Sequence, residues 1–313
     1  LFVIHSRKDR WKRVESCYTS TTLVGEFTGG VVFEDDLGFL DQGVAQGGVV
    51  DTPDGRWFCY LFQDRGAAGR MPVLIPMTWE DGMPVIGENG KVPAMVTNRC
   101  ERPGWVCAPL YGSDDFRGEM KPFWEWNHIP DRSLLSYGSG RYTIRFGKTC
   151  ESLTQAANTL TQRTLYPGCF AAVTLDGSQL RDGDIAGLCA LQDRWAFAGL
   201  ACEAGELFVT LRARNENGPA DGVEVERISV PGDRVRLGVW FDFECMKDKA
   251  TFYLQQNGAW RELGQGYRHQ MTYLLTHFTG YRIALFGFAR EGAGGSAAFE
   301  DFVYETEKPA CYI

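Results

Sequence analysis

The stretch Gly43–Arg70 constrains the fold of this sequence more than any other part. It contains two runs typical of strands, Gly48–Asp51 and Arg56–Gln63, which are joined by Thr52–Gly55. In this connection Pro and Gly stand where a tight reversal of the chain requires them. The stretch therefore predicts a β-hairpin, with polar residues and glycines at its ends that allow other groups to approach closely.

The rest of the sequence also favours strands. No stretch with helical periodicity is longer than about three turns. Short alternating runs, separated by Gly, Asp or Asn turns, follow at regular spacing over 169–175, 185–191, 195–202, 205–213, 222–229, 233–243 and 250–256. This spacing is typical of a β-sandwich. The 13% aromatic content and 37 glycines agree with an all-β protein rich in turns.

The net charge and the cysteines bear on the possible binding partners and on the cellular location. A formal net charge of −8 disfavours nucleic acid and anionic membranes as partners and suits a neutral ligand. The ten cysteines form no C-x-x-C pair and no zinc spacing, so we expect reduced thiols and, from them, a cytoplasmic location. The sequence begins in mid-strand at Leu1 without a signal peptide, so we interpret its start as an internal cut that says little about localisation.

The hairpin closely resembles glycoside hydrolase family 43, whose five-bladed β-propellers remove xylose or arabinose from plant polysaccharides. The resemblance lies in the order QGG, V, DT, DG, W over Gln46–Trp57 and in an Arg after the next strand, Arg70. The run Met71–Pro84 is similar to the family's segment that follows this Arg. The resemblance implies that residues 1–112 are the last blades of a propeller.

A second set of motifs resembles the accessory sandwich that follows certain family 43 catalytic domains. These motifs are WEWNHIPD at Trp124–Asp131, NTLTQRT at Asn158–Thr164, GDIAGL at Gly183–Leu188 and HFTGYR at His277–Arg282. They imply a concanavalin-A-like β-sandwich (jelly roll) over 123–313, with 113–122 as a linker.

Family 43 enzymes invert the anomeric carbon with three acids on inner strands of the first three blades. The motifs of these acids have no counterpart here, so no catalytic residue is assigned, and this chain alone is expected to be inactive. Its partner would be the missing N-terminal propeller segment, from a truncation or as a second chain. The acids Glu34–Asp36 are interpreted as a solvated face, and Asp51 as a residue that holds the turn of the hairpin.

The resemblance assigns sugar contacts to Arg70 and, on the accessory domain, to Phe278 as one wall of the pocket. Gln46 and Phe62 are further candidates for substrate binding. No cofactor is expected. A structural calcium ion is considered because many relatives have a His before the Gln, but Ala45 replaces it here, which argues against the ion.

The implied function is that of an inverting exo-glycosidase that removes xylose or L-arabinofuranose from xylan or arabinoxylan, with a pentose-containing oligosaccharide as ligand. The two pentoses present similar hydroxyl patterns, and the sequence does not choose between them. The alternative is a non-catalytic carbohydrate-binding sandwich that targets or supports a glycosidase, since sandwich folds serve many functions.

Overall fold

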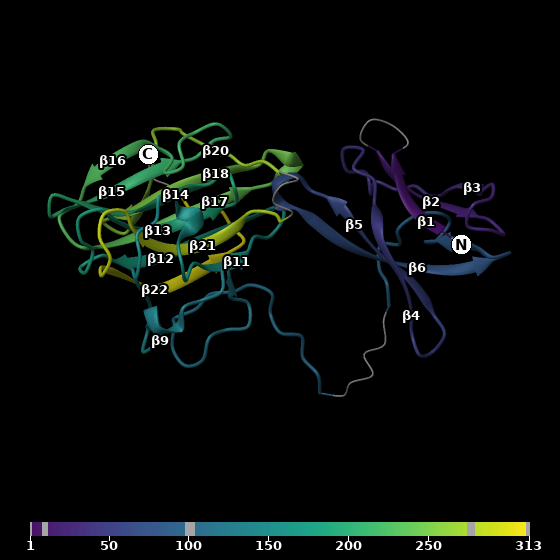
Figure 1. Cartoon of the computed structure of the whole chain (residues 1–313), viewed down its shortest axis with the longest axis horizontal. Helices are drawn as coiled ribbons and strands as arrows, with labels where there is room; N and C mark the ends of the chain where they lie inside the picture. The colour runs from purple at the N-terminus through teal and green to yellow at the C-terminus, as the bar shows by residue number, and fades with distance from the viewer. Residues whose placement is uncertain (1, 8–11, 98–103, 274–278, 311–313) are drawn as a thin grey trace. The chain divides into compact units, whose positions relative to one another are not determined.

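The computed structural model describes residues 2–7, 12–97, 104–273 and 279–310. Strands and short 3-10 helices make up its regular structure, and the chain divides into two compact units, Leu1–Trp105 and Val106–Ile313 (Figure 1). Among the residues described, no helix has the length and apolarity that crossing a membrane would require. The all-β class predicted from the sequence is confirmed.

The first unit contains two antiparallel sheets in which sequence neighbours pair. The strands are β1 (Phe2–Arg7), β2 (Arg13–Thr19) and β3 (Thr28–Phe33) in one sheet, and β4 (Ala45–Asp51), β5 (Trp57–Asp64), β6 (Arg70–Glu80) and β7 (Met83–Ile86) in the other. One apolar cluster, which includes Phe33, Cys59, Ile75 and Ile86, joins strands from both sheets. This core fixes the two sheets against each other, since burial of apolar area is the main favourable term in folding.

The predicted hairpin is formed by β4 and β5. The backbone N–H of Thr52 donates to the carbonyl of Arg56 at 2.9 Å, and Gly55 closes the turn with a φ of +81°. The Thr52 hydroxyl donates to the Asp54 carboxylate at 2.5 Å and to the Arg56 carbonyl at 3.0 Å. Thr52 and Asp54 therefore hold this turn, and the exposed Asp51, to which we assigned that role, does not make these bonds.

The acidic loop before β4 differs from the solvated face that we expected. Asp35 is buried, and its carboxylate accepts the backbone N–H groups of Leu37 at 3.1 Å and Val92 at 2.8 Å. Burial opposes ionisation of Asp35, but these bonds and the nearby Lys91 hold its pKa below the usual value. The Asp35 carboxylate therefore connects this loop to the backbone of Val92.

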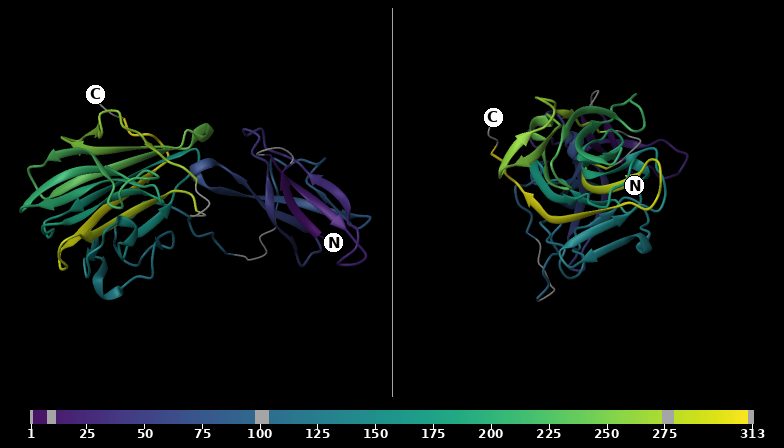
Figure 2. Two further views of the ribbon diagram at one scale, coloured as in Figure 1. Left: turned by 45° about the horizontal axis from the view of Figure 1, so that its top comes forward. Right: turned by 90° about the vertical axis from the view of Figure 1, so that its left-hand side faces the viewer.

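The second unit is a sandwich of two antiparallel sheets, which lie face to face (Figures 1 and 2). The first sheet has the order β19 (Ala259–Glu262), β18 (Lys249–Gln256), β17 (Arg234–Asp242), β12 (Gly168–Asp176), β22 (Ser296–Glu305), β10 (Arg141–Arg145) and β9 (Leu135–Gly138), and β20 (His269–Gln270) pairs with β18. The second sheet has the order β16 (Val223–Ser229), β15 (Glu206–Ala213), β14 (Ala196–Glu203), β13 (Asp184–Leu191), β21 (Arg282–Ala289), β11 (Leu160–Arg163) and β8 (Glu125–Trp126).

Central strands of this sandwich are buried on both faces. Every residue of β13 is buried, as are all of β12 except its last. On the outer face of the second sheet, Trp195, Phe197 and Phe286 form an apolar cluster that includes Leu153 from the 3-10 helix η3 (Leu153–Gln155). Continuous burial of both faces explains why the strand runs here are almost wholly apolar.

Residues 113–122, which we expected as a linker, pack on the second unit. Asp114 pairs by backbone hydrogen bonds with Phe302 of β22, and its carboxylate accepts the indole N–H of Trp124 at 2.7 Å. Phe116 is fully buried against the Trp124 and Tyr137 rings. Asp114 and Phe116 are the buried residues of this irregular and otherwise largely exposed segment, and they anchor it to the sandwich. The eight cysteines among the described residues are all free thiols.

Candidate functional site

The candidate site of the first unit lies where β5 ends and β6 begins. Asp64 and Arg70 are direct register partners in this strand pair, and the guanidinium Nε lies 3.6 Å from the carboxylate Oδ1. Between them the 3-10 helix η1 (Gly66–Ala68) and Gly69, at a φ of +92°, reverse the chain. Only glycine takes that conformation without strain, so the turn fixes where Arg70 starts its strand.

Phe62 supports two guanidinium groups. The Cζ atom of Arg70 lies 4.3 Å from the centroid of its ring, and that of Arg13 lies 4.9 Å from it. Arg13 also forms an ion pair with Asp64. An arginine over an aromatic face is attracted by the ring quadrupole, and a shared carboxylate fixes its direction. Arg70 is therefore held in place while a quarter of its side chain, 26%, stays exposed.

Gln46 lies in a β-bulge of β4. The register passes from Ala45–Phe62 to Gly48–Tyr60, so β4 carries one extra residue, and Gln46 has a φ of +63°. A Cβ atom on Gly47 would lie 1.9 Å from the carbonyl oxygen of Tyr60, which explains why glycine follows Gln46. Ala45, which precedes Gln46 in β4, pairs with Phe62, the residue whose ring contacts both arginines.

A buried carboxylate supports this bulge from β2. Glu15 is 3% exposed and accepts the backbone N–H of Gln46. Burial raises the pKa of Glu15, and the bond from Gln46 offsets this only in part. Because this carboxylate already bonds to backbone, we interpret Glu15 as a positioning residue of the bulge.

Together these residues can bind an uncharged ligand rich in hydroxyl groups. The Arg70 guanidinium offers several donors in a fixed planar arrangement, and the charge of both arginines is balanced in part by Asp64. An anion would meet Asp64, whereas sugar hydroxyls can accept from the guanidinium and donate to the carboxylate. The cluster therefore offers both donors and an acceptor to a neutral polar ligand.

The structure brings Arg70 and Phe62 into contact and places Gln46 on the neighbouring strand, whereas Phe278 lies outside the described residues. The sequence analysis missed Asp64, Arg13 and Glu15. Asp64 could have been found from the expected pairing of β5 with β6, in which it lies opposite Arg70. Arg13 and Glu15 gave no such signal, because they come from β2, in another sheet and well before β4 in the sequence.

Two of the accessory-domain motifs, WEWNHIPD with β8 and NTLTQRT with β11, meet at one edge of the second sheet. In this place β8 pairs with β11, and Glu125 forms ion pairs with Arg163 and Arg282. Burial opposes ionisation of Glu125, but the two arginines hold its pKa below the usual value. Beside this network lies a hollow of about 260 Å³, lined in part by Trp126 and Thr279.

The residues around Ala45, where a calcium ion was considered and argued against, offer a poor ligand set for calcium. Calcium takes six to eight oxygen ligands, many of them carboxylates. Ala45 is buried and has no donor side chain, the Glu15 carboxylate accepts from Gln46, and the Asp64 carboxylate pairs with Arg13 and Arg70. Across residues 2–7, 12–97, 104–273 and 279–310, no three His, Cys, Asp or Glu side chains are grouped to hold a metal ion.

Comparisons with known proteins agree with these two units. The family model described as the β-xylosidase C-terminal concanavalin A-like domain matches residues 113–305. A protein of Xylanibacter ruminicola named "Putative beta-xylosidase" is 33% identical over 231 residues, which cover 69% of this chain and 40% of that protein. The solved structure titled as a bifunctional GH43-CE protein of Bacteroides eggerthii has a TM-score of 0.82 at 35% identity, and covers 98% of this chain and 39% of that one.

A further similar structure is a GH43 glycoside hydrolase that was engineered to display both endo-xylanase and exo-arabinofuranosidase activity. Its TM-score is 0.79 at 26% identity, and the match covers 97% of this chain and 64% of that protein. This chain therefore spans between about two fifths and two thirds of the length of these relatives.

Fold and motifs define the second unit as a concanavalin A-like sandwich of the kind that ends β-xylosidases. The chain belongs to glycoside hydrolase family 43.

Proposed function

We propose that this chain is the C-terminal part of an inverting exo-glycosidase that removes xylose or L-arabinofuranose from xylan or arabinoxylan. Its family and the β-xylosidase relative support the reaction class. The observation that carries the proposal is the cluster of Arg70, Asp64, Arg13 and Phe62, which holds one partly exposed guanidinium in a fixed direction. A pure binding sandwich has no need of this cluster in another unit.

We further propose that the two sheets of the first unit are the last two blades of a five-bladed propeller. Each sheet is a simple antiparallel meander, and the two share one apolar core, as successive blades do. Apolar side chains outside that core stay exposed, with Val31 at 53%, Val50 at 49% and Tyr60 at 55%. Further blades would cover such side chains.

The acids that transfer protons are proposed to lie outside residues 1–313. Inversion requires a general acid and a general base about 6.5–9.5 Å apart, so that a water molecule fits between the base and the sugar. In this reaction Arg70 would bind hydroxyl groups of the terminal sugar. A guanidinium next to a catalytic carboxylate would also favour its ionised form.

The test is Arg70→Lys in the complete enzyme, in which this chain is joined to its upstream segment. Lysine keeps the charge but cannot reproduce the forked geometry, so kcat/KM on 4-nitrophenyl xyloside or arabinofuranoside should fall about 30- to 150-fold, which corresponds to roughly 2–3 kcal/mol for a charged hydrogen bond.

Arg56→Lys is the matched control, because Arg56 lies at the exposed hairpin turn and pairs with Asp54. Its kinetics and the melting temperatures of both variants should equal those of the parent enzyme. Residues 1–313 alone should show no turnover. Unchanged kinetics in Arg70→Lys, or clear hydrolysis by this chain alone, would contradict the proposal.

A further inference from the structure

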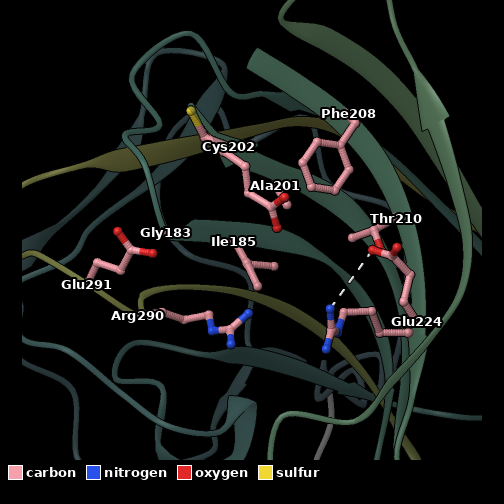
Figure 3. A pocket seen from close by; sticks show the side chains of 11 residues that line it. Gly183, Ile185, Ala201, Cys202, Phe208, Thr210, Glu224, Arg290 and Glu291 are labelled. Atoms are coloured by element: carbon pink, nitrogen blue, oxygen red, sulfur yellow. Dashed lines mark hydrogen bonds and ion pairs between the residues drawn. The ribbon is translucent and has the colours of Figure 1, made fainter. Parts of the chain in front are cut away.

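A second polar pocket lies on the outer face of the second sheet of the sandwich (Figure 3). It has a volume of about 220 Å³ and is lined by β13, β14, β15, β16 and the residues that directly follow β21. We call it the β15 pocket, and its main lining residues are Ile185, Phe208, Thr210, Arg212, Glu224 and Arg290. It lies on the same sheet face as the apolar cluster around Phe197 and Phe286.

The floor of the β15 pocket is apolar and firmly built. Ile185, Ala201 and Phe208 are each between 4% and 6% exposed and belong to that cluster. In Figure 3 Ile185 lies at the centre of the hollow, with the Phe208 ring on one side and Arg290 and Glu224 on the opposite sides. Apolar groups at the base of a polar hollow can contact the C–H face of a ligand.

The walls carry charged groups whose directions are fixed by mutual pairing. The Nη2 atoms of Arg212 and Arg290 both lie 3.2 Å from Oδ2 of Asp221. Glu224 accepts the Thr210 hydroxyl at 3.1 Å and the Nε of Arg227 at 2.9 Å. These side chains therefore stay in place without a ligand, so a ligand would pay little ordering entropy on binding.

The walls still have capacity for further hydrogen bonds. Glu224 is 29% and Arg290 39% exposed at the side chain, although each has a protein partner. Glu224 accepts one hydrogen bond from Thr210 and two from Arg227, and a carboxylate has about four acceptor sites. Arg290 donates to Asp221, and a guanidinium has five donors. Each side chain can therefore also bond a ligand. Guanidinium donors and carboxylate acceptors thus line the same hollow.

The charge balance excludes an anion as the preferred ligand. Of the lining residues, Glu203, Glu224 and Glu291 are acidic and Arg212 and Arg290 are basic, which leaves a net negative wall. The size excludes a large ligand, since pockets for drug-sized molecules span roughly 300–1,000 Å³. A small neutral molecule with adjacent hydroxyl groups can donate to the carboxylates, accept from the guanidinium groups and lay its C–H face on the floor.

We propose that the β15 pocket is a second carbohydrate-binding site, which takes one neutral pentose unit of a xylo-oligosaccharide. The choice of xylan-derived sugars rests on the proposed function, whereas the preference for a neutral, hydroxyl-rich unit follows from the pocket itself. The sandwich then holds substrate by this site as well as supporting the fold.

The experiment titrates xylotriose into residues 1–313 that carry Arg70→Lys, so that the first unit does not contribute, and follows binding by calorimetry or ligand-observed NMR. Saturable binding in the millimolar range is expected. Glu224→Gln and Arg290→Gln should each weaken it at least fivefold, because each removes one fixed charged partner. Arg268→Gln is the control: Arg268 pairs with Glu262 of β19 in the other sheet, so binding should not change.

Melting temperatures of all variants verify that the sandwich stays folded. Absence of saturable binding, binding that both pocket variants retain, or tighter binding of glucuronic acid than of xylose would overturn the proposal. Failure of the glycosidase proposal would appear instead as unchanged hydrolysis by Arg70→Lys in the complete enzyme, and this binding assay does not depend on that result.

Discussion

At the scale of single residues, His269 couples the stability of the sandwich to pH. It is fully buried, its Nε2 lies 3.3 Å from the carbonyl oxygen of Arg194, and its ring lies 6.2 Å from that of Tyr281. Burial lowers the pKa of His269 to about 4, and the nearby charges of Lys249 and Arg194 act in the same direction. The folded protein therefore keeps this imidazole neutral.

This lowered pKa predicts acid destabilisation. Between pH 4 and 6.5 the unfolded chain binds a proton on His269 that the folded chain does not. The contribution of His269 to the free energy of unfolding is therefore fully present above pH 6.5 and is lost as the pH falls towards 4. The shift corresponds to ~3 kcal/mol, since one pKa unit is about 1.4 kcal/mol. Urea unfolding of the sandwich at pH 7.5, 6.0 and 5.0, followed by tryptophan fluorescence, measures it.

The control for this prediction is His269→Asn, in which the loss between pH 7.5 and 5.0 should become smaller. Asp184 acts in the opposite direction, because burial raises its pKa to about 6 and its folded form gains a proton as the pH falls. Subtracting the pH dependence of the unfolding free energy of His269→Asn from that of the parent protein removes the contribution of Asp184. Equal pH dependence in both would show that His269 does not set this window.

At the scale of elements, the bulge of β4 predicts a contrast between two neighbouring glycines. A Cβ atom at Gly47 would meet the backbone of Tyr60 at 1.9 Å, whereas one at Gly48 would have no atom within 4 Å. Gly47→Ala should destabilise the first unit by about 2–3 kcal/mol, because the strand pair must separate to accept it. Gly48→Ala should change the stability by less than about 0.5 kcal/mol.

Chemical denaturation of both variants, followed by the fluorescence of Trp57 and Trp79 in the first-unit core, provides the comparison. The substitution at Gly47 should also weaken the bond between Gln46 and Glu15, so sugar binding should fall with it. Equal stability of the two variants would mean that the bulge relaxes without cost.

Local patterns predicted the strands of this protein well. The seven sandwich runs expected between 169 and 256 correspond to β12 to β18, with ends that differ by no more than one residue. Alternation and turn residues are local signals, and these strands follow them. The order of the sheets does not follow from them, since β12 pairs with β17 and β22, far along the chain. The pairing of Asp114 with Phe302 was missed for the same reason.

The candidate site shows the same division. Gln46, Phe62 and Arg70 lie on three consecutive strands of one sheet, β4, β5 and β6, and could be grouped from sequence alone. Arg13 and Glu15 reach the hairpin from another sheet, and only the tertiary structure shows that Arg13 pairs with Asp64. The β15 pocket was not predicted, because its charged residues lie on or next to separate strands and form a pocket only when β13, β14, β15 and β16 align.

At the scale of the whole molecule, the two units differ in how completely they bury their strands. In β4 every residue after Gln46 is exposed, and β4 pairs with β5 alone. In β12 and β13 nearly every residue is buried, and both strands pair on two sides. Local opening costs least where few apolar contacts and many exposed hydrogen bonds occur, so the first unit should open more readily than the sandwich.

Hydrogen exchange measured by mass spectrometry tests this difference. In residues 1–313, amides of β4 should exchange at least about 100-fold faster than those of β12, which corresponds to roughly 3 kcal/mol of opening free energy. The control for edge position is β16, which is a partly exposed edge strand of the sandwich. When the upstream segment is joined to the chain, new blades would pair with or cover the first unit. Exchange in β4 should then slow while exchange in β16 stays the same.

Protection of β4 equal to that of β12 in residues 1–313 would mean that the first unit is complete by itself, and the proposed propeller would lose its support.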